Sequence, residues 1–395
     1  MTAEGVTRRV TAADDPLVGV VVGRYQLLYK LASGGMGTVY VGRATGVGGF
    51  ERLVAVKVLH AHLAEKDEFV KMFLDEARLA ARIHHPNVVA TLDVFEEGGR
   101  YFLVMDYVRG LELGVLIRRA QGRQSRLPVP LVLRIVLDAA QGLGEAHALT
   151  TRDGEPLNLV HRDVSPQNIL VGADGISRLT DFGVAKAEHR LSWTRGGGFK
   201  GKLAYASPEQ LDSSLTEQRS DLFSLGIVLW EALTHRRLFT GEDKFTIMRS
   251  VLEARIPAPS SINAELAPFD PVVAGALARE PSARFGTAAE LIHAIENAAA
   301  ACGIATQPSV AEWVRALGSE EAEHEQRLRS AEASIAQAAT SAPDGSDPSQ
   351  PQSGVESSGG GRRSATVQLE AQDEGASAFA GSTAAATPAA RQGEA

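Results

Sequence analysis

The spacing of apolar and polar residues divides the chain into a β-rich first part and a helical second part. Three short runs at 24–31, 39–45 and 52–60 are rich in aromatic and β-branched residues and are separated by glycine clusters. This pattern predicts strands joined by turns. From 65 to 83, Phe69, Phe73, Ala77 and Ala80 recur at helical spacing among charges, which predicts an amphipathic helix. The proline of the following His-His-Pro-Asn ends it, because proline disfavours helical geometry in the preceding residue.

Two more strands are predicted within 88–108, on either side of the Gly98-Gly99 turn. After Gly110 the pattern becomes mostly helical, with loops that contain proline or glycine. The most apolar run, 222–233, contains Glu231 and is too short to span a membrane, so we interpret it as a buried core helix. The expected fold is α+β, with a small β-rich N-lobe carrying one helix, a larger helical C-lobe, and a cleft between them.

Changes in composition suggest four segments. Residues 1–22 are polar and predicted to be a flexible leader, and 23–300 form the main domain. Residues 301–340 form a helical extension, and the helix around Trp313 packs on its own domain or binds a partner. Residues 341–395 are rich in Ala, Gly, Ser, Pro and Gln, and they bury too little apolar surface to offset ordering entropy. We therefore expect a disordered tail.

Charge and cysteine content exclude several classes of protein. The net charge is −8 over 395 residues and the basic residues are dispersed, so nucleic acid is not an expected partner. Cys302 is the single cysteine, which excludes an internal disulfide and a cysteine-based zinc site and favours the reducing cytoplasm. No window offers about 18 uncharged apolar residues, so no transmembrane segment is expected.

A glycine-rich turn and a lysine are the first candidates for phosphate chemistry. The turn reads Ala32-x-Gly34-x-x-Gly37-x-Val39; it suits a phosphate-covering loop, and an ordinary glycine hairpin is the alternative. Lys57 lies on the expected third strand, and Glu76 lies 19 residues later on the amphipathic helix. Pairing of the two would hold the ammonium group against the α and β phosphates of a nucleotide.

A sharper constellation follows at His161-Arg162-Asp163, with Asn168 five residues after Asp163 and Asp181-Phe182-Gly183 beyond it. Asp163 can accept the proton of an attacking hydroxyl. Asn168 and Asp181 offer the hard oxygen ligands that magnesium prefers. The alternative, in which these residues only cap loops, does not account for their order and spacing.

Several motifs over about 24–300 resemble the bacterial branch of the eukaryotic-like (Hanks-type) Ser/Thr protein kinases. They are, in order, GGMGTVY, VAVK, HPNVV, VMDYVRG, HRDVSPQN, DFGVAK, YASPEQ, SDLFSLGIVLWE and PSARF. The resemblance implies the two-lobed protein kinase fold and transfer of the γ-phosphate of ATP, with magnesium, to serine or threonine of protein substrates.

The resemblance also implies particular site residues. Met105 would be the gatekeeper, and the backbone of Asp106 and Val108 would bind adenine. Glu209 would pair with Arg284, and Asp221 would anchor the catalytic loop, residues 161–168. The implied nucleotide contacts are Leu31, Gly34, Gly35, Gly37, Val39, Ala55, Lys57, Met105, Asp106, Val108 and Leu170.

The catalytic loop departs from the family pattern in one position. Family members carry lysine two residues after the catalytic aspartate, where this chain has Ser165, and they commonly carry threonine where it has Lys202. We interpret the two changes as one exchange, in which Lys202 supplies the ammonium group that contacts the γ-phosphate. The alternative is that Ser165 disables the enzyme and Lys202 is an exposed charge.

The sequence also suggests phosphorylation sites that could regulate the protein, and it leaves other functions to be compared. Arg162 and Lys186 would bind a phosphorylated Thr194 or Ser192, unless the loop stays unmodified. The tail sequence at 362–366, RRSAT, resembles a basic-directed phosphorylation site or pseudosubstrate, and an incidental charged pair is the alternative. A pseudokinase scaffold is the competing function; a small-molecule phosphotransferase is disfavoured by the activation segment, and tyrosine specificity by the YASPEQ segment.

Overall fold

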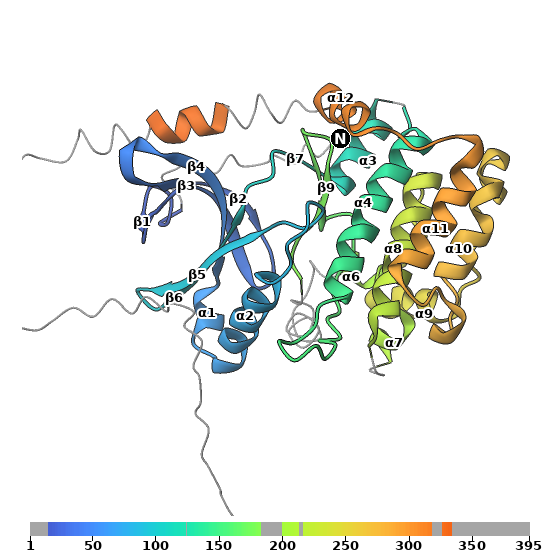
Figure 1. The fold of residues 1–395 in the computed structure, drawn as a ribbon, viewed down its shortest axis with the longest axis horizontal. Coiled ribbons are helices and arrows are strands. Elements are labelled where there is room, and N and C mark those ends of the chain that lie inside the picture. Colours follow the sequence, from blue (N-terminus) through green and yellow to red (C-terminus); the bar gives the residue numbers. More distant parts are fainter. Residues whose placement is uncertain (1–14, 124, 183–199, 213–215, 318–325, 334–395) are drawn as a thin grey trace, which may run out of the picture. The chain divides into compact units, whose positions relative to one another are not determined.

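A computed structural model describes residues 15–123, 125–182, 200–212, 216–317 and 326–333 (Figure 1). All of these residues belong to the unit formed by 1–348.

The N-lobe is built on an antiparallel six-stranded sheet with the order β1-β2-β3-β4-β6-β5. Its strands are β1 (Val21–Val22), β2 (Tyr25–Ser33), β3 (Gly37–Thr45), β4 (Glu51–Leu59), β5 (Thr91–Glu97) and β6 (Arg100–Asp106). In β4, Ala55 and Lys57 are two residues apart and therefore share one face of the sheet. Ala55 stands opposite Met105 of β6, so the register brings these site residues together.

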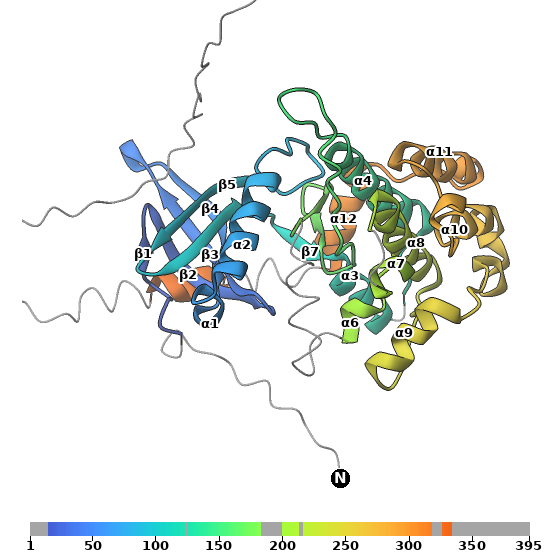
Figure 2. The ribbon, with the colours of Figure 1, turned by 90° about the horizontal axis from the view of Figure 1, so that it is seen from below.

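Helix α2 (Asp67–Ala80) covers that face of the sheet, as Figure 2 shows. Phe69, Phe73 and Ala77 are buried in one cluster with Leu103 and Met105. The same buried side of the helix carries Glu76, so the apolar spacing that forms the helix also fixes the direction of this carboxylate. The four-residue helix α1 (Ala61–Ala64) precedes α2.

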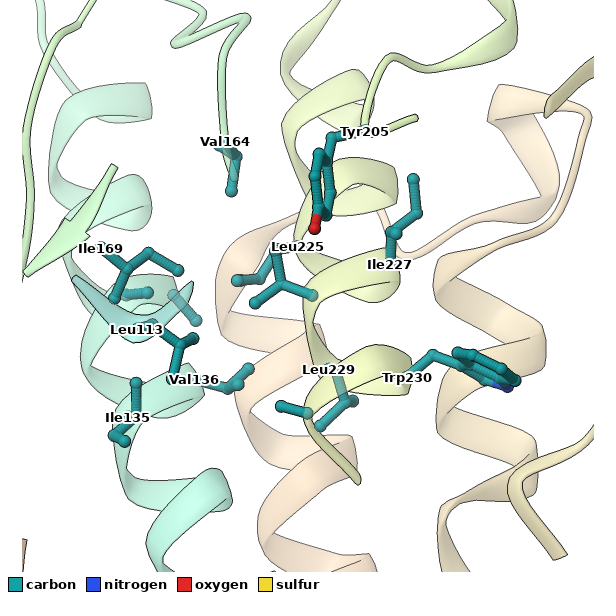
Figure 3. Close-up of a cluster of buried hydrophobic side chains, with 14 of the residues drawn as sticks. Leu113, Ile135, Val136, Val164, Ile169, Tyr205, Leu225, Ile227, Leu229 and Trp230 are labelled. Atoms are coloured by element: carbon teal, nitrogen blue, oxygen red, sulfur yellow. The ribbon is translucent and has the colours of Figure 1, made fainter. Parts of the chain in front are cut away.

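The C-lobe is mainly helical and surrounds α8, which is buried along nearly its whole length from 220 to 234. Figure 3 shows Val136 of α4 and Leu225 of α8 in the same apolar cluster, with Val164 of the catalytic loop above them. The helices are α3 (Leu113–Gly122), α4 (Val129–His147), α6 (Lys200–Leu203), α7 (Pro208–Leu211), α8 (Gln218–Thr234), α9 (Lys244–Glu253), α10 (Asp270–Ala276), α11 (Ala288–Ala298) and α12 (Gln307–Leu317).

A second sheet, β7-β8-β9, lies beside these helices and carries the segment between the catalytic loop and Asp181. Its strands are β7 (Gly110–Glu112), β8 (Ile169–Gly172) and β9 (Ser177–Leu179). Short 3₁₀ turns occur at Val47–Gly49, Pro259–Ser261, Ala264–Phe269, Pro281–Ala283 and Ala299–Ala301.

The predicted two-lobed α+β fold is confirmed, including the helix after the third strand and the core helix at 222–233. Part of the segment assigned to the leader contacts the sheet: β1 pairs with β2, and the Tyr40 hydroxyl donates to Asp15 at 3.0 Å. Among the described residues, no helix is both long and apolar enough to cross a membrane.

Candidate functional site

A cavity of about 490 Å³ is lined by residues of both lobes. This volume lies within the range of small-molecule sites. The predicted site residues that line it are Leu31, Gly34, Gly37, Val39, Ala55, Lys57, Met105, Asp106, Val108, Asp163, Asn168, Leu170, Asp181 and Lys202. Gly35, Glu76, Arg162 and Ser165 do not line it, although Glu76 touches Lys57 from behind.

One end of the cavity is apolar and is flanked by the segment that joins the lobes. Val39, Ala55 and Leu170 pack in or against the cluster that contains Met105. The backbone amide of Asp106 donates to the carbonyl of Ala90 at 2.9 Å, so this amide is already used within the protein. Apolar walls with a few backbone polar groups at the edge suit a flat heteroaromatic base.

At the other end, Lys57 lies between two carboxylates. Its Nζ lies 2.7 Å from Asp181 Oδ1 and 3.6 Å from Glu76 Oε1, and Lys57 and Glu76 are 6% and 5% exposed. Burial raises the pKa of the Asp181 carboxyl, but the charge and hydrogen bond of the adjacent Lys57 ammonium, together with Lys202 and His161, outweigh burial and hold that pKa below its usual value. Asp181 is therefore ionised at neutral pH.

Asp221, at the start of α8, anchors the catalytic loop. Its two carboxylate oxygens accept hydrogen bonds from the backbone amides of His161 and Arg162, both at 2.8 Å. Arg162 has a φ of 67°, a left-handed conformation that costs a non-glycine residue energy and that these bonds help to fix. The His161 ring packs against Phe182, with ring centroids 4.4 Å apart. The predicted anchoring role of Asp221 matches these contacts.

Asn168 is oriented by Asp163. Its Nδ2 donates to the backbone carbonyl of Asp163 at 2.7 Å and to Asp163 Oδ2 at 2.8 Å. Because the amide nitrogen is used in this way, Asn168 Oδ1 is the atom available to a cation, together with the carboxylate of Asp181. The described residues contain no cluster of three or more His, Cys, Asp or Glu side chains that would hold a metal by itself. The donor set fits magnesium, which usually takes one or two protein oxygens plus phosphate and water oxygens.

Lys202, on α6, reaches the catalytic loop. Its Nζ lies 2.6 Å from Asp163 Oδ2, and both residues line the cavity. Ser165 is fully buried, and its Oγ has no hydrogen-bond partner among the described residues. The ammonium group beside Asp163 therefore comes from the later segment that contains α6, and the Ser165 hydroxyl lies in the same loop as Asp163.

A buried ion pair holds the segment around α7 to the C-lobe. Arg284 donates to both oxygens of Glu209, at 2.7 and 2.8 Å, and Ser220 Oγ donates to Glu209 Oε1 at 2.5 Å. Burial raises the pKa of the Glu209 carboxyl, but the hydrogen bonds from Arg284 and Ser220 outweigh burial, so the pKa lies below its usual 4.5. The predicted pairing of Glu209 with Arg284 is confirmed.

Two groups of residues differ between the site predicted from the sequence and the site in the structure. Lys186, Ser192 and Thr194, predicted to take part in regulation, lie outside the described residues. Conversely, Val314, Arg327 and Leu328 of the C-terminal extension line the cavity and were not predicted. Their helical spacing is visible in the sequence, but no motif connects them with a cavity whose other residues lie more than about 100 positions earlier in the chain.

Comparison with known proteins gives consistent matches. Residues 25–295 match the family model described as protein kinase domain. The tyrosine-protein kinase MasK of Myxococcus xanthus is 40% identical over 276 residues, which are 70% of this chain and 43% of that protein. The serine/threonine-protein kinase PknL of Mycobacterium tuberculosis is 38% identical over 276 residues, 69% of this chain and 65% of PknL. The chain thus spans less than two thirds of either relative.

The chain is also similar to a solved structure. The crystal structure of the Mycobacterium tuberculosis PknI kinase domain superposes with a TM-score of 0.54 at 28% sequence identity, covering 71% of this chain and 98% of that one.

Proposed function

Because this chain belongs to the protein kinase family, we propose that it transfers the γ-phosphoryl group of ATP to hydroxyl groups of proteins. One observation carries the proposal: Lys57, Asp163, Asn168 and Asp181 all line a single cavity whose other end is apolar. An adenine base would occupy the apolar end, between Ala55 and Leu170, and the phosphates would extend toward Lys57.

Different residues of the chain have different roles in the proposed reaction. Lys57, held by Glu76 and Asp181, orients the α and β phosphates. The acceptor hydroxyl oxygen forms a bond to the γ-phosphorus, the bond to the bridging oxygen breaks, ADP leaves, and the hydroxyl proton passes to Asp163. Asn168 Oδ1 and Asp181 would hold magnesium, which when bound neutralises charge on the phosphate oxygens.

Lys202 is proposed to supply the positive charge at the γ-phosphate. In its support, Nζ lies 2.6 Å from Asp163, the residue that must face the acceptor hydroxyl, and buried Ser165 carries no charge. Lys202 is about one third exposed, so its long side chain has room to turn from Asp163 toward an incoming phosphate. Replacement by threonine should lower kcat at least about 10²-fold. Unchanged kcat in Lys202→Thr would leave Lys202 as a surface charge.

Serine and threonine are the proposed acceptors. The YASPEQ segment and the name of the relative PknL support this assignment. Tyrosine is the second candidate, because the relative MasK is named a tyrosine-protein kinase. Phosphoamino-acid analysis of the labelled product separates the two: phosphoserine and phosphothreonine are expected, and phosphotyrosine alone would reassign the acceptor.

Cytoplasmic signalling controlled by loop phosphorylation is proposed as the setting. Arg162 and Lys186 would bind phosphorylated Thr194 or Ser192, and the C-terminal tail would be a site for partners or autophosphorylation. Mass spectrometry after incubation with ATP should find phosphate on Thr194 or Ser192. A fully active enzyme with an unmodified loop would remove the regulatory proposal.

Activity is tested by incubating the protein with γ-labelled ATP, magnesium and a generic protein acceptor. Labelled acceptor is expected with the wild-type protein and not with Asp163→Asn, which keeps the side-chain shape but cannot accept the proton. Nucleotide binding without transfer would instead support the pseudokinase scaffold. A phosphoproteome comparison of wild-type and Lys57→Met cells would then identify substrates.

A further inference from the structure

The C-terminal extension is fixed to the C-lobe by α12. Val310, Val314 and Leu317 are buried in the main apolar cluster. The C-terminal carbonyls of the helix accept hydrogen bonds from two arginines: Arg119 of α3 donates to Leu317 at 3.1 Å, and Arg123, the residue after α3, donates to Ala316 at 2.6 Å. Cations at the C-terminal end of a helix also interact favourably with its dipole, so this docking is stabilised by both packing and charge.

The next described part of the extension, residues 326–333, contacts the N-lobe instead. It is helical, and Figure 1 draws it beside strands β3 and β4. Ala331 is 6% exposed and packs in a cluster with Leu28, Tyr29 and Val41. On the same helix Glu332 forms an ion pair with Arg43 of β3. The extension therefore holds one lobe by α12 and the other by 326–333.

Both parts of the extension also reach the cavity. Val314 of α12 lines it from the C-lobe side, and Arg327 and Leu328 line it from the N-lobe side. Leu328 packs in the same cluster as Tyr107, which lines the cavity between Asp106 and Val108, where the base is expected to bind. Two apolar side chains and one cation of the extension are thus placed at the nucleotide pocket.

We propose that the extension is a clasp that forms a further wall of the nucleotide pocket and holds the two lobes in the spacing that binds nucleotide. This inference rests on the proposed binding of ATP. Leu328 and Val314 supply apolar contact beside the base, and Arg327 supplies positive charge at the rim. Because the clasp is attached to both lobes, release of 326–333 opens the wall and frees the lobes to separate. The apparent affinity for nucleotide is then proportional to the fraction of molecules in which the clasp is docked, so it decreases when the clasp is released.

The test uses the full chain with Ala331→Asp, which places a carboxylate in the apolar contact without altering a cavity-lining residue. Ala333→Asp is the matched control, because it introduces the same charge two residues later at an exposed position. Binding of magnesium-ADP is measured by calorimetry, and hydrogen exchange of 326–333 is measured in parallel. We expect about 10-fold weaker binding and faster exchange for Ala331→Asp and neither change for Ala333→Asp. Leu328→Ala, which trims the wall, should weaken binding by a smaller factor.

The outcomes separate this inference from the proposed function. Wild-type protein that binds no nucleotide would overturn both. Equal affinity of wild-type and Ala331→Asp, with 326–333 exchanging faster in the variant, would overturn the clasp and leave the kinase proposal intact. Unprotected exchange of 326–333 in the wild-type protein, or an unchanged rate in the variant, would overturn the clasp as well, since a docked helix must resist exchange and must lose that resistance when its contact is charged.

Discussion

Arg284 and Glu209 form the most enclosed ion pair among the described residues of the C-lobe, with side chains 0% and 8% exposed. Removal of one partner leaves the other charge buried without its counterion. We expect Arg284→Ala to lower the free energy of unfolding by about 3–5 kcal/mol, measured by urea denaturation. Arg78→Ala is the control, because its pair with Asp75 is about half exposed and should contribute less than about 1 kcal/mol. Equal effects of the two substitutions would contradict this view of the pair.

The same pair gives a pH dependence of stability. Because the pKa of Glu209 is lower in the folded protein than its usual 4.5, its contribution is complete above that pH and is lost as the pH falls toward the folded-state pKa. Glu209→Gln should therefore be less stable than wild type at neutral pH, and the difference should shrink in acid. The free energy of unfolding, measured between about pH 3 and 7, checks this. If the difference in the free energy of unfolding between wild type and Glu209→Gln stays constant over this pH range, the lowered pKa of Glu209 does not contribute to stability.

Among the elements, the turn between β8 and β9 limits how α12 docks. Gly175 has a φ of 84°, and a Cβ there would lie 1.9 Å from the carbonyl oxygen of Gln307, the first residue of α12. Gly154 has a φ of 86° with nothing within 4 Å of the same added atom. Alanine at either position costs about 1–2 kcal/mol in backbone strain. Gly175→Ala adds a steric clash with the backbone of Gln307, whereas Gly154→Ala adds none. Urea denaturation should show a clearly larger loss for Gly175→Ala, and equal losses would mean that α12 does not press on this turn.

Local sequence patterns were sufficient to predict most helices and strands, but they did not predict how these elements pack against one another. The apolar repeat of Phe69, Phe73 and Ala77 predicted α2 because one face of that helix is buried, and the mostly apolar run at 222–233 predicted a buried core helix. Neither signal says what a helix packs against. The hydrogen bond from Tyr40 to Asp15 and the docking of Ala331 on the N-lobe arise from contacts between residues far apart in sequence. No local periodicity reports such contacts.

The site was predictable to a similar extent. The kinase motifs identified the family, which the match over 25–295 confirms, and most of the catalytic, nucleotide-binding and metal-binding residues that they named line the cavity. The proposed exchange of Ser165 and Lys202 could be suggested from the sequence because the family pattern has lysine and threonine at these positions, and the structure brings Lys202 beside Asp163. Val314 and Leu328 carry no motif, so their place at the cavity needed coordinates.

At the scale of the whole molecule, nucleotide binding should stabilise the fold. A ligand at 100 times its Kd adds about 2.7 kcal/mol to the free energy of unfolding, which corresponds to a rise in Tm of about 5–10 °C for a domain of this size. Lys57→Met removes the ammonium group that meets the phosphates, so we expect most of this rise to disappear. Thermal denaturation with and without magnesium-ATP measures it. An unchanged rise in the variant would place the phosphates away from Lys57.

In the proposed reaction, Lys202 supplies the charge that Ser165 does not. This role is tested by a double-mutant cycle of kcat for phosphoryl transfer in wild type, Lys202→Thr, Ser165→Lys and the double variant. We expect kcat to be at least about 10²-fold lower for Lys202→Thr, and most of that loss to be recovered when Ser165→Lys is added, because an ammonium group again reaches the γ-phosphate. Full activity of Lys202→Thr alone, or no recovery in the double variant, would contradict it.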